Sequence, residues 1–333
     1  MQDVRERAWG GHWWTVVPHF GGLLRQRALP AGSAWHGRTA DGAVLSGVLH
    51  VSPGRHRRTL VVVVHGLGGD VDRPYVRHAA AAALARGASA LRLNLRGADL
   101  RSSDFYHAGL TADLHAVLAS PALADFDTVH FVGFSLGGHL ACRLAAEADD
   151  PRVGRLVALC PPLDLAACQR FLDDPWRSLY RYNLLVGLRA TYQAAAARGP
   201  VPTPWAQVRK VKRLYDWDQL TVVPRFGFAS PDAYYAEVSA GPALAHARRP
   251  LLIVAVADDP IVPFGLCVAP WLTDLPACVE VRVLQSGGHV YFPGDAHAGI
   301  GDLPGVEHQV VHWLLDEGAQ RRQNDGLTST SRV

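Results

Sequence analysis

The feature that most constrains the fold is a strand-to-helix turn predicted between residues 128 and 139, T-V-H-F-V-G-F-S-L-G-G-H. Residues 128–132 have the apolar pattern of a strand, and an Ala- and Leu-rich helix follows. Residues 133–137 between them match G-x-S-x-G, in which the two glycines keep a crowded turn free of Cβ clashes. This context predicts that Ser135 is a nucleophile, with the N-terminus of the helix directed at a developing oxyanion. The alternative is a simple Gly/Ser turn at a strand end.

Apolar runs of strand length alternate with helical patterns along most of the chain, and this alternation predicts an α/β fold with a parallel, doubly wound sheet. We expect strands at 43–51, 59–64, 89–94, 127–132, 153–159, 250–257 and 279–284, and helices at 75–86, 108–118, 136–148 and 305–317.

The alternation stops between Cys160 and Arg249, where aromatic residues and helical patterns occur without a clear strand. We interpret 160–249 as a helical cap inserted over the active site. The cap divides the core into 1–159 and 250–318, and the polar residues 319–333 are expected to form a flexible C-terminal tail.

Composition argues against several other classes of function. The chain has 333 residues and a net charge of +3, so it has no strong field for nucleic acid or an anionic membrane. One short basic patch, Arg209, Lys210, Lys212 and Arg213, is more typical of a solvated surface. The chain has five cysteines, and their spacing is not that of a metal site, so we expect reduced thiols in a cytoplasmic protein. Residues 1–11 are charged and lack the apolar core of a signal peptide, and no apolar run is long enough to span a membrane.

A serine nucleophile needs a base and an acid that orients the base, and in one known chain order the acid follows the serine and the histidine comes last. The predicted strand 250–257 is followed by D-D-P-I-V-P, which offers Asp258 and Asp259 at a strand end. We favour Asp259 because it directly precedes P-I-V-P; Asp258 would then be a turn-capping carboxylate. The last predicted strand is followed by Ser-Gly-Gly and His289, the expected base; a structural loop histidine is the alternative.

The oxyanion needs two backbone donors. We expect the amide of Leu136, after the nucleophile, and that of Leu67, in the loop H-G-L-G-G that follows the strand at 59–64. His65 in this loop could brace it or contact substrate. The loop lacks the Gly-Lys-Ser/Thr of a phosphate-binding loop, so we set that function aside.

These motifs in combination resemble the α/β-hydrolase superfamily, and more narrowly its YheT-like branch (the embryogenesis-associated, abhydrolase-4 type). The resemblance covers roughly residues 10–318. It is carried by G-H-x-x-T at 11–15, H-G-L-G-G at 65–69, P-Y-V-R at 74–77, N-L-R-G at 94–97, Y-H-A-G at 106–109 with Asp113, G-F-S-L-G-G-H at 133–139, P-L-D-L at 162–165, Gly227-Phe228, Tyr234-Tyr235, Ser239, D-D-P at 258–260 and G-G-H at 287–289.

The resemblance implies an α/β-hydrolase fold and a triad of Ser135, Asp259 and His289 acting on carboxylic esters. The chain departs from the family at His139, where Asn is usual, and at Trp13-Trp14, so a finer substrate assignment does not follow. The expected partner is a small-molecule acyl ester, with no cofactor, metal or nucleic acid; the oligomeric state stays open. An acyltransferase or thioesterase with the same triad, and a non-catalytic binding member of the fold, are the alternatives.

Overall fold

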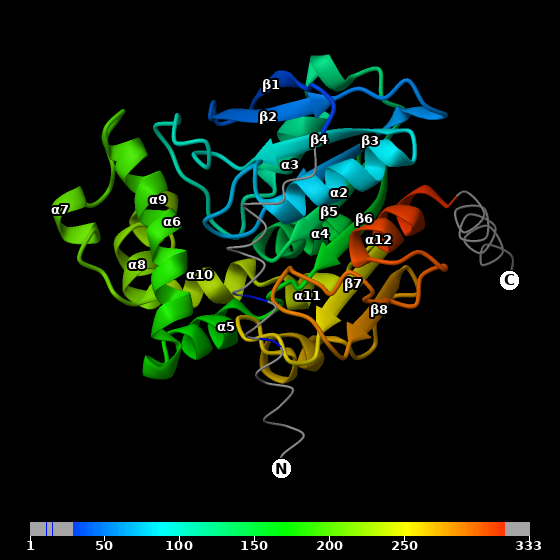
Figure 1. The fold of residues 1–333 in the computed structure, drawn as a ribbon. Coiled ribbons are helices and arrows are strands. Elements are labelled where there is room, and N and C mark those ends of the chain that lie inside the picture. The colour runs from blue at the N-terminus through cyan, green and yellow to red at the C-terminus, as the bar shows by residue number, and fades with distance from the viewer. Residues whose placement is uncertain (1–10, 12–14, 16–28, 317–333) are drawn as a thin grey trace, which may run out of the picture.

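In the computed structural model, which describes residues 11, 15 and 29–316, eight strands form one twisted sheet (Figure 1). Its spatial order is β1-β2-β4-β3-β5-β6-β7-β8. The strands are β1 (Ser33–Arg38), β2 (Val44–His50), β3 (His56–Val64), β4 (Ala88–Asn94), β5 (Thr128–Phe134), β6 (Val153–Leu159), β7 (Leu251–Val256) and β8 (Val279–Leu284).

All neighbouring strands from β4 to β8 pair in parallel, whereas β2 is antiparallel to both β1 and β4. The predicted fold class, a mostly parallel doubly wound α/β sheet, is confirmed. Sequence analysis missed β1, because this edge strand buries one large apolar residue, Trp35, and has no continuous apolar run.

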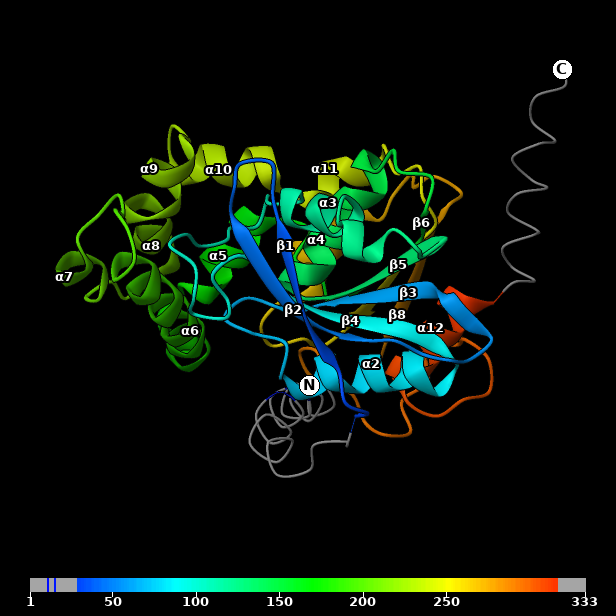
Figure 2. The same cartoon turned by 90° about the horizontal axis from the view of Figure 1, so that it is seen from above.

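Helices cover both faces of the sheet and bury a separate apolar core on each (Figure 2). On one face lie α2 (Pro74–Ala85) and α12 (Val306–Leu315); on the other lie α3 (Ala112–Leu118), α4 (Leu136–Glu147) and α11 (Ala240–Leu244). The helix expected from residue 108 begins at Ala112 instead. Residues 107–111 form turns there, and the Ala108 amide donates to the Tyr234 hydroxyl rather than entering a helix.

Helices fill the chain between β6 and β7, and α6 to α9 lie beyond one end of the sheet (Figure 1). Besides α11 they are α5 (Leu165–Leu172), α6 (Ser178–Ala196), α7 (Trp205–Val208), α8 (Leu214–Leu220), α9 (Val222–Phe226), α10 (Pro231–Val238) and the short η2 (Pro175–Arg177). Three more short turns, η1 (Pro121–Leu123), η3 (Phe264–Val268) and η4 (Ala269–Trp271), lie elsewhere. The division into core and cap stays a prediction, and the predicted tail 319–333 lies outside the described residues.

A cluster of ion pairs joins α9 to the chain that follows β4. Arg96, fully buried after β4, pairs with Asp113 at 2.9 Å and with Asp104 at 3.2 Å. Arg225 in α9 pairs with the same Asp104 at 2.9 Å. The buried guanidinium is therefore compensated by carboxylates, as a buried charge requires. Among the described residues, no helix has both the length and the apolar character that a bilayer crossing requires.

Candidate active site

The turn between β5 and α4 holds Ser135 in a strained backbone conformation. Its φ of 52° lies in the left-handed region, which is uncommon for a residue with a side chain. A Cβ added at Gly133 would lie 2.0 Å from the Gly137 carbonyl oxygen, so glycine is required there. Because these glycines let the end of β5 and the start of α4 pack closely, the chain turns sharply between them. Ser135 therefore lies at the N-terminus of α4, as the G-x-S-x-G pattern predicts.

Three predicted site residues meet in one hydrogen-bonded line. The Ser135 Oγ lies 2.8 Å from His289 Nε2, and His289 Nδ1 lies 2.8 Å from Asp259 Oδ2. A carboxylate beside Nδ1 requires the proton on that nitrogen, which leaves Nε2 to accept from the serine hydroxyl. His289 and Asp259 are both buried, so water does not compete for these bonds.

The chain after β7 fixes the Asp259 carboxylate. Its second oxygen, Oδ1, accepts hydrogen bonds from the amides of Ile261 at 2.8 Å and Val262 at 2.9 Å. These amides belong to the P-I-V-P segment that favoured Asp259 over Asp258 in the sequence. The structure brings Asp259, and not the side chain of Asp258, to His289.

A residue from the N-terminal segment fixes the backbone of the histidine. The His289 amide donates to Thr15 Oγ1 at 2.8 Å, and the Thr15 hydroxyl donates to the Gly11 carbonyl at 2.8 Å. A Cβ at Gly11 would lie 2.3 Å from the Asp258 carbonyl oxygen, so this segment packs directly on the acid's loop. Sequence reasoning missed this role, although G-H-x-x-T was a signal; Trp13 and Trp14 lie outside the described residues.

The amides of Leu67 and Leu136, the predicted oxyanion donors, lie beside Ser135 and donate to no other described residue. The amides on either side of Leu67 are engaged, since Gly66 donates to the Tyr75 hydroxyl at 3.2 Å and Gly68 to the Tyr106 hydroxyl at 2.7 Å. Leu67 itself donates to no described residue. Leu136 is the first residue of α4, where an amide has no intrahelical acceptor. Leu67, Leu136 and Ser135 line one cavity.

His65 braces the loop that carries Leu67. Its Nδ1 donates to the Gly66 carbonyl at 2.7 Å, and its Nε2 accepts from the Leu95 amide at 3.2 Å. Burial lowers the pKa of His65 to about 4, so the ring is neutral and both nitrogens are occupied. This geometry fits the bracing role and leaves no nitrogen for substrate.

His139 connects α4 to two distant segments. Its ring nitrogens lie 2.8 Å from the Pro162 carbonyl oxygen and 2.9 Å from that of Val238. Burial lowers the pKa of His139 to about 4, so the neutral ring donates only one hydrogen. Arg143 already donates to the Val238 oxygen at 3.0 Å, which favours donation from Nδ1 to Pro162.

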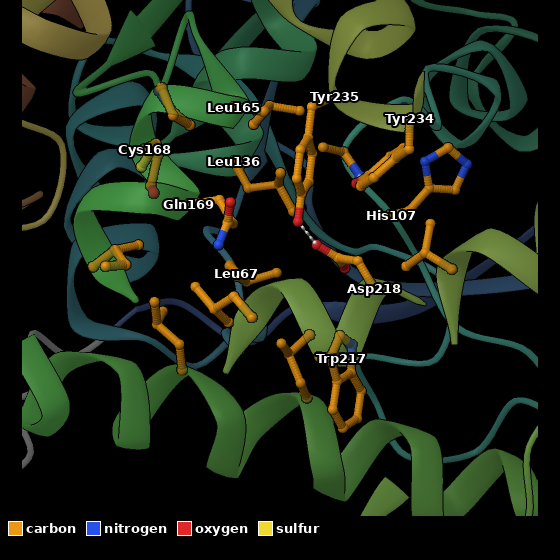
Figure 3. Close-up of a pocket in the computed structure, with 18 of the residues that line it drawn as sticks. Leu67, His107, Leu136, Leu165, Cys168, Gln169, Trp217, Asp218, Tyr234 and Tyr235 are labelled. Carbon is orange, nitrogen blue, oxygen red and sulfur yellow. Dashed lines mark hydrogen bonds between the residues drawn. The ribbon is translucent and has the colours of Figure 1, made fainter. Parts of the chain in front are cut away.

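The cavity beside Ser135 has a volume of about 110 Å³ and a mainly apolar wall (Figure 3). Its lining comes from the loops at the ends of the strands and from α4, α5, α6, α8, α9 and α10. The residues are Leu67, Tyr106, His107, Ala108, Ser135, Leu136, Pro162, Leu165, Cys168, Gln169, Leu172, Leu184, Leu188, Leu214, Trp217, Asp218, Val222, Tyr234, Tyr235, Ile261 and Val262. Such a pocket suits an apolar group attached to a reacting carbonyl.

One group of possible metal ligands is found within residues 11, 15 and 29–316. The donor atoms of Cys160, Asp259 and His289 lie within 4.8 Å of one another. A cation there would have to displace the hydrogen bonds that join Asp259, His289 and Ser135. Burial raises the pKa of the Cys160 thiol well above its usual range, so this sulfur stays protonated and does not compete with Ser135 as a nucleophile.

Comparison with known proteins identifies the family of the chain. The family model described as "alpha/beta hydrolase fold" matches residues 59–295. The chain belongs to the alpha/beta hydrolase fold family. Within it, the chain is 33% identical to Escherichia coli YheT, which carries an esterase name, over 70% of each chain. It is 26% identical to the embryogenesis-associated protein EMB8 of Picea glauca, over 77% of this chain but 58% of that protein. The predicted resemblance to the YheT-like branch of the alpha/beta hydrolases is therefore confirmed.

The fold is also similar to solved alpha/beta hydrolase structures. The Pyrococcus furiosus esterase Pf2001 superposes with a TM-score of 0.51 at 15% sequence identity, over 78% of this chain and 83% of that chain. At this identity the likeness supports the fold alone.

Proposed function

We propose that this alpha/beta hydrolase cleaves carboxylic esters through an acyl-enzyme on Ser135. The observation that carries the proposal is the line Ser135–His289–Asp259, with both distances at 2.8 Å and with the acid and the base buried. A serine, a base and an orienting acid in this geometry are the parts that acyl transfer needs. The esterase name of YheT points the same way.

The first half of the reaction forms the acyl-enzyme. Ser135 Oγ attacks the ester carbonyl while its proton passes to His289 Nε2, and Asp259 stabilises the resulting imidazolium and holds its orientation. The amides of Leu67 and Leu136 donate to the oxyanion. The tetrahedral intermediate then collapses, the C–O bond to the alcohol breaks, and His289 returns the proton to the leaving alkoxide.

The second half restores the enzyme. A water molecule gives a proton to His289 and attacks the acyl carbon, and collapse of the second tetrahedral intermediate releases the carboxylic acid and protonates Ser135. The cavity beside Ser135 holds the acyl group during both halves.

Replacing the nucleophile tests the proposal. Ser135→Ala is expected to lower ester hydrolysis on the order of 10³-fold or more, measured as acid release from ethyl butanoate, and to abolish covalent labelling by a fluorophosphonate probe. Ser286→Ala, an exposed serine before the histidine loop, is the matched control and should keep both properties. Activity of Ser135→Ala within about tenfold of wild type would contradict the triad assignment.

A further inference from the structure

A carboxyl group lines the mainly apolar cavity on the side formed by the helices between β6 and β7. Asp218 of α8 accepts a hydrogen bond from the Tyr235 hydroxyl of α10 at 2.5 Å, and Figure 3 shows the two groups meeting among the lining side chains. Within the described part of the chain, Tyr235 is the one hydrogen-bond partner of this side chain. The second carboxyl oxygen of Asp218 therefore has no donor.

Gln169 of α5 presents a second acceptor to the same cavity. Its Nε2 donates to Asp173 Oδ2 at 2.5 Å, and Asp173 also accepts from the amides of Leu214 and Tyr215. This anchoring fixes the orientation of the amide, so the Gln169 carbonyl oxygen points away from Asp173. No described residue donates to that oxygen.

Two tyrosine hydroxyls in the lining still have a hydrogen to donate. Tyr106 accepts from the Gly68 amide at 2.7 Å and Tyr234 accepts from the Ala108 amide at 3.0 Å. Neither hydroxyl donates to a described residue. The cavity thus combines unfilled acceptors with available donors, so a ligand that offers a complementary polar group can form hydrogen bonds with both kinds.

A structural tie between helices does not account for Asp218. A second Tyr–Asp bond, from Tyr215 to Asp232 at 2.8 Å, joins the same helices α8 and α10 on the exterior. The outer pair can hold the helices together without placing a carboxyl group against the substrate. Among residues 11, 15 and 29–316, no basic side chain pairs with Asp218, and burial raises the pKa of its carboxyl group to about 7.

We infer that the acyl group of the preferred substrate is short and carries a hydroxyl group, which Asp218 and Gln169 recognise. A hydroxyl both donates and accepts, so it matches the acceptors and the tyrosine donors together. An ammonium group on the acyl chain would fit less well, because it only donates hydrogen bonds, cannot accept from the tyrosine hydroxyls and needs an ionised partner. The volume of about 110 Å³ limits the chain length, because a cavity of about 150 Å³ holds one benzene molecule.

The inference rests on the proposed ester hydrolysis, and matched substrates test it separately. Wild-type enzyme is compared on ethyl butanoate and ethyl 3-hydroxybutanoate, on ethyl hexanoate and ethyl 6-hydroxyhexanoate, and on ethyl 3-aminobutanoate, by acid release at constant pH. We expect the hydroxylated ester of at least one pair to have a kcat/KM about tenfold or more above its plain partner. Equal or better use of both plain esters, or preference for the amino ester, would overturn the inference.

Substitutions then test which residues are responsible for the preference for the hydroxylated ester. Asp218→Ala should reduce the hydroxylated-to-plain ratio of kcat/KM about tenfold, whereas the matched control Asp232→Ala should leave that ratio unchanged. An unchanged ratio in a folded Asp218→Ala would remove Asp218 from the recognition. If Asp218→Ala does not fold, Gln169→Met provides the same measurement. Hydrolysis of no ester together with absent fluorophosphonate labelling would instead defeat the proposed function itself.

Discussion

The two halves of the candidate site are built in different ways. The nucleophile half comes from one contiguous segment, β5–turn–α4, in which Gly133 and Gly137 allow the close crossing that presents Ser135. The acid–base half is assembled from segments far apart: Asp259 follows β7, His289 follows β8, and Thr15 holds the His289 amide. One half depends on local backbone geometry and the other on long-range hydrogen bonds, so mutations should damage them differently.

The largest effect is expected in the acid–base half. Asp259→Asn should lower kcat/KM roughly 10⁴-fold, because the amide no longer selects the tautomer in which His289 Nε2 accepts from Ser135. Asp258→Asn, the neighbouring control, should cost less than about tenfold. Steady-state kinetics on ethyl butanoate measures both, and the reverse order of damage would assign the acid to Asp258.

In the nucleophile half, a single methyl group should disrupt the fold. Gly133→Ala places a Cβ 2.0 Å from the Gly137 oxygen, and this backbone clash should destabilise the protein by about 4 kcal/mol or more. Urea unfolding and soluble yield measure the loss. Gly265→Ala is the control, because its Cβ would meet nothing within 4 Å. A normally stable Gly133→Ala would contradict the account of the turn.

Thr15 tests whether the acid–base half can be loosened without unfolding the protein. Thr15→Val keeps the side-chain shape but removes the acceptor of the His289 amide, so we expect a roughly 10- to 100-fold loss of kcat with little change in KM. Thr15→Ser should restore most of the rate because it retains the hydroxyl. If Thr15→Val and Thr15→Ser had the same kcat, Thr15 would have only a packing role.

The smallest effect concerns protonation in the nucleophile half. The pKa of His139 is held near 4, against an ordinary value of 6.5, so below pH 6.5 the unfolded chain binds a proton that the folded chain excludes. His139 therefore lowers stability as the pH falls from 6.5 to 4, by about 2 kcal/mol at pH 5.

His139→Asn removes this titration. The loss of unfolding free energy between pH 7 and pH 5 should be smaller in the variant than in wild type, as measured by urea unfolding at both pH values. His36→Asn, at an exposed position in β1, is the matched control for the same replacement away from this buried site. Equal acid sensitivity in His139→Asn and wild type would show that His139 is not the residue responsible.

The same contrast explains what the sequence could predict. The turn at Ser135 was recognisable because strand, glycines, serine and helix are adjacent in the chain. Asp259 and His289 could be chosen because each follows a recognisable strand. Two hydrogen bonds were not expected: that from the His289 amide to Thr15 and that from Tyr235 to Asp218. Each joins segments of the chain that no local sequence pattern shows to be in contact. The edge strand β1 was missed because its alternation is too weak.

The hydrogen bond between the His289 amide and Thr15 also has a consequence for how the enzyme matures. The two residues are 274 positions apart, so this contact has a high loop-closure cost and is expected to form late in folding. During synthesis the nucleophile turn can leave the ribosome and fold well before His289 has been made. Catalytic competence should then appear only after the distant segments have closed on each other, and the recovery of hydrolysis during refolding should lag behind the recovery of sheet and helix signals.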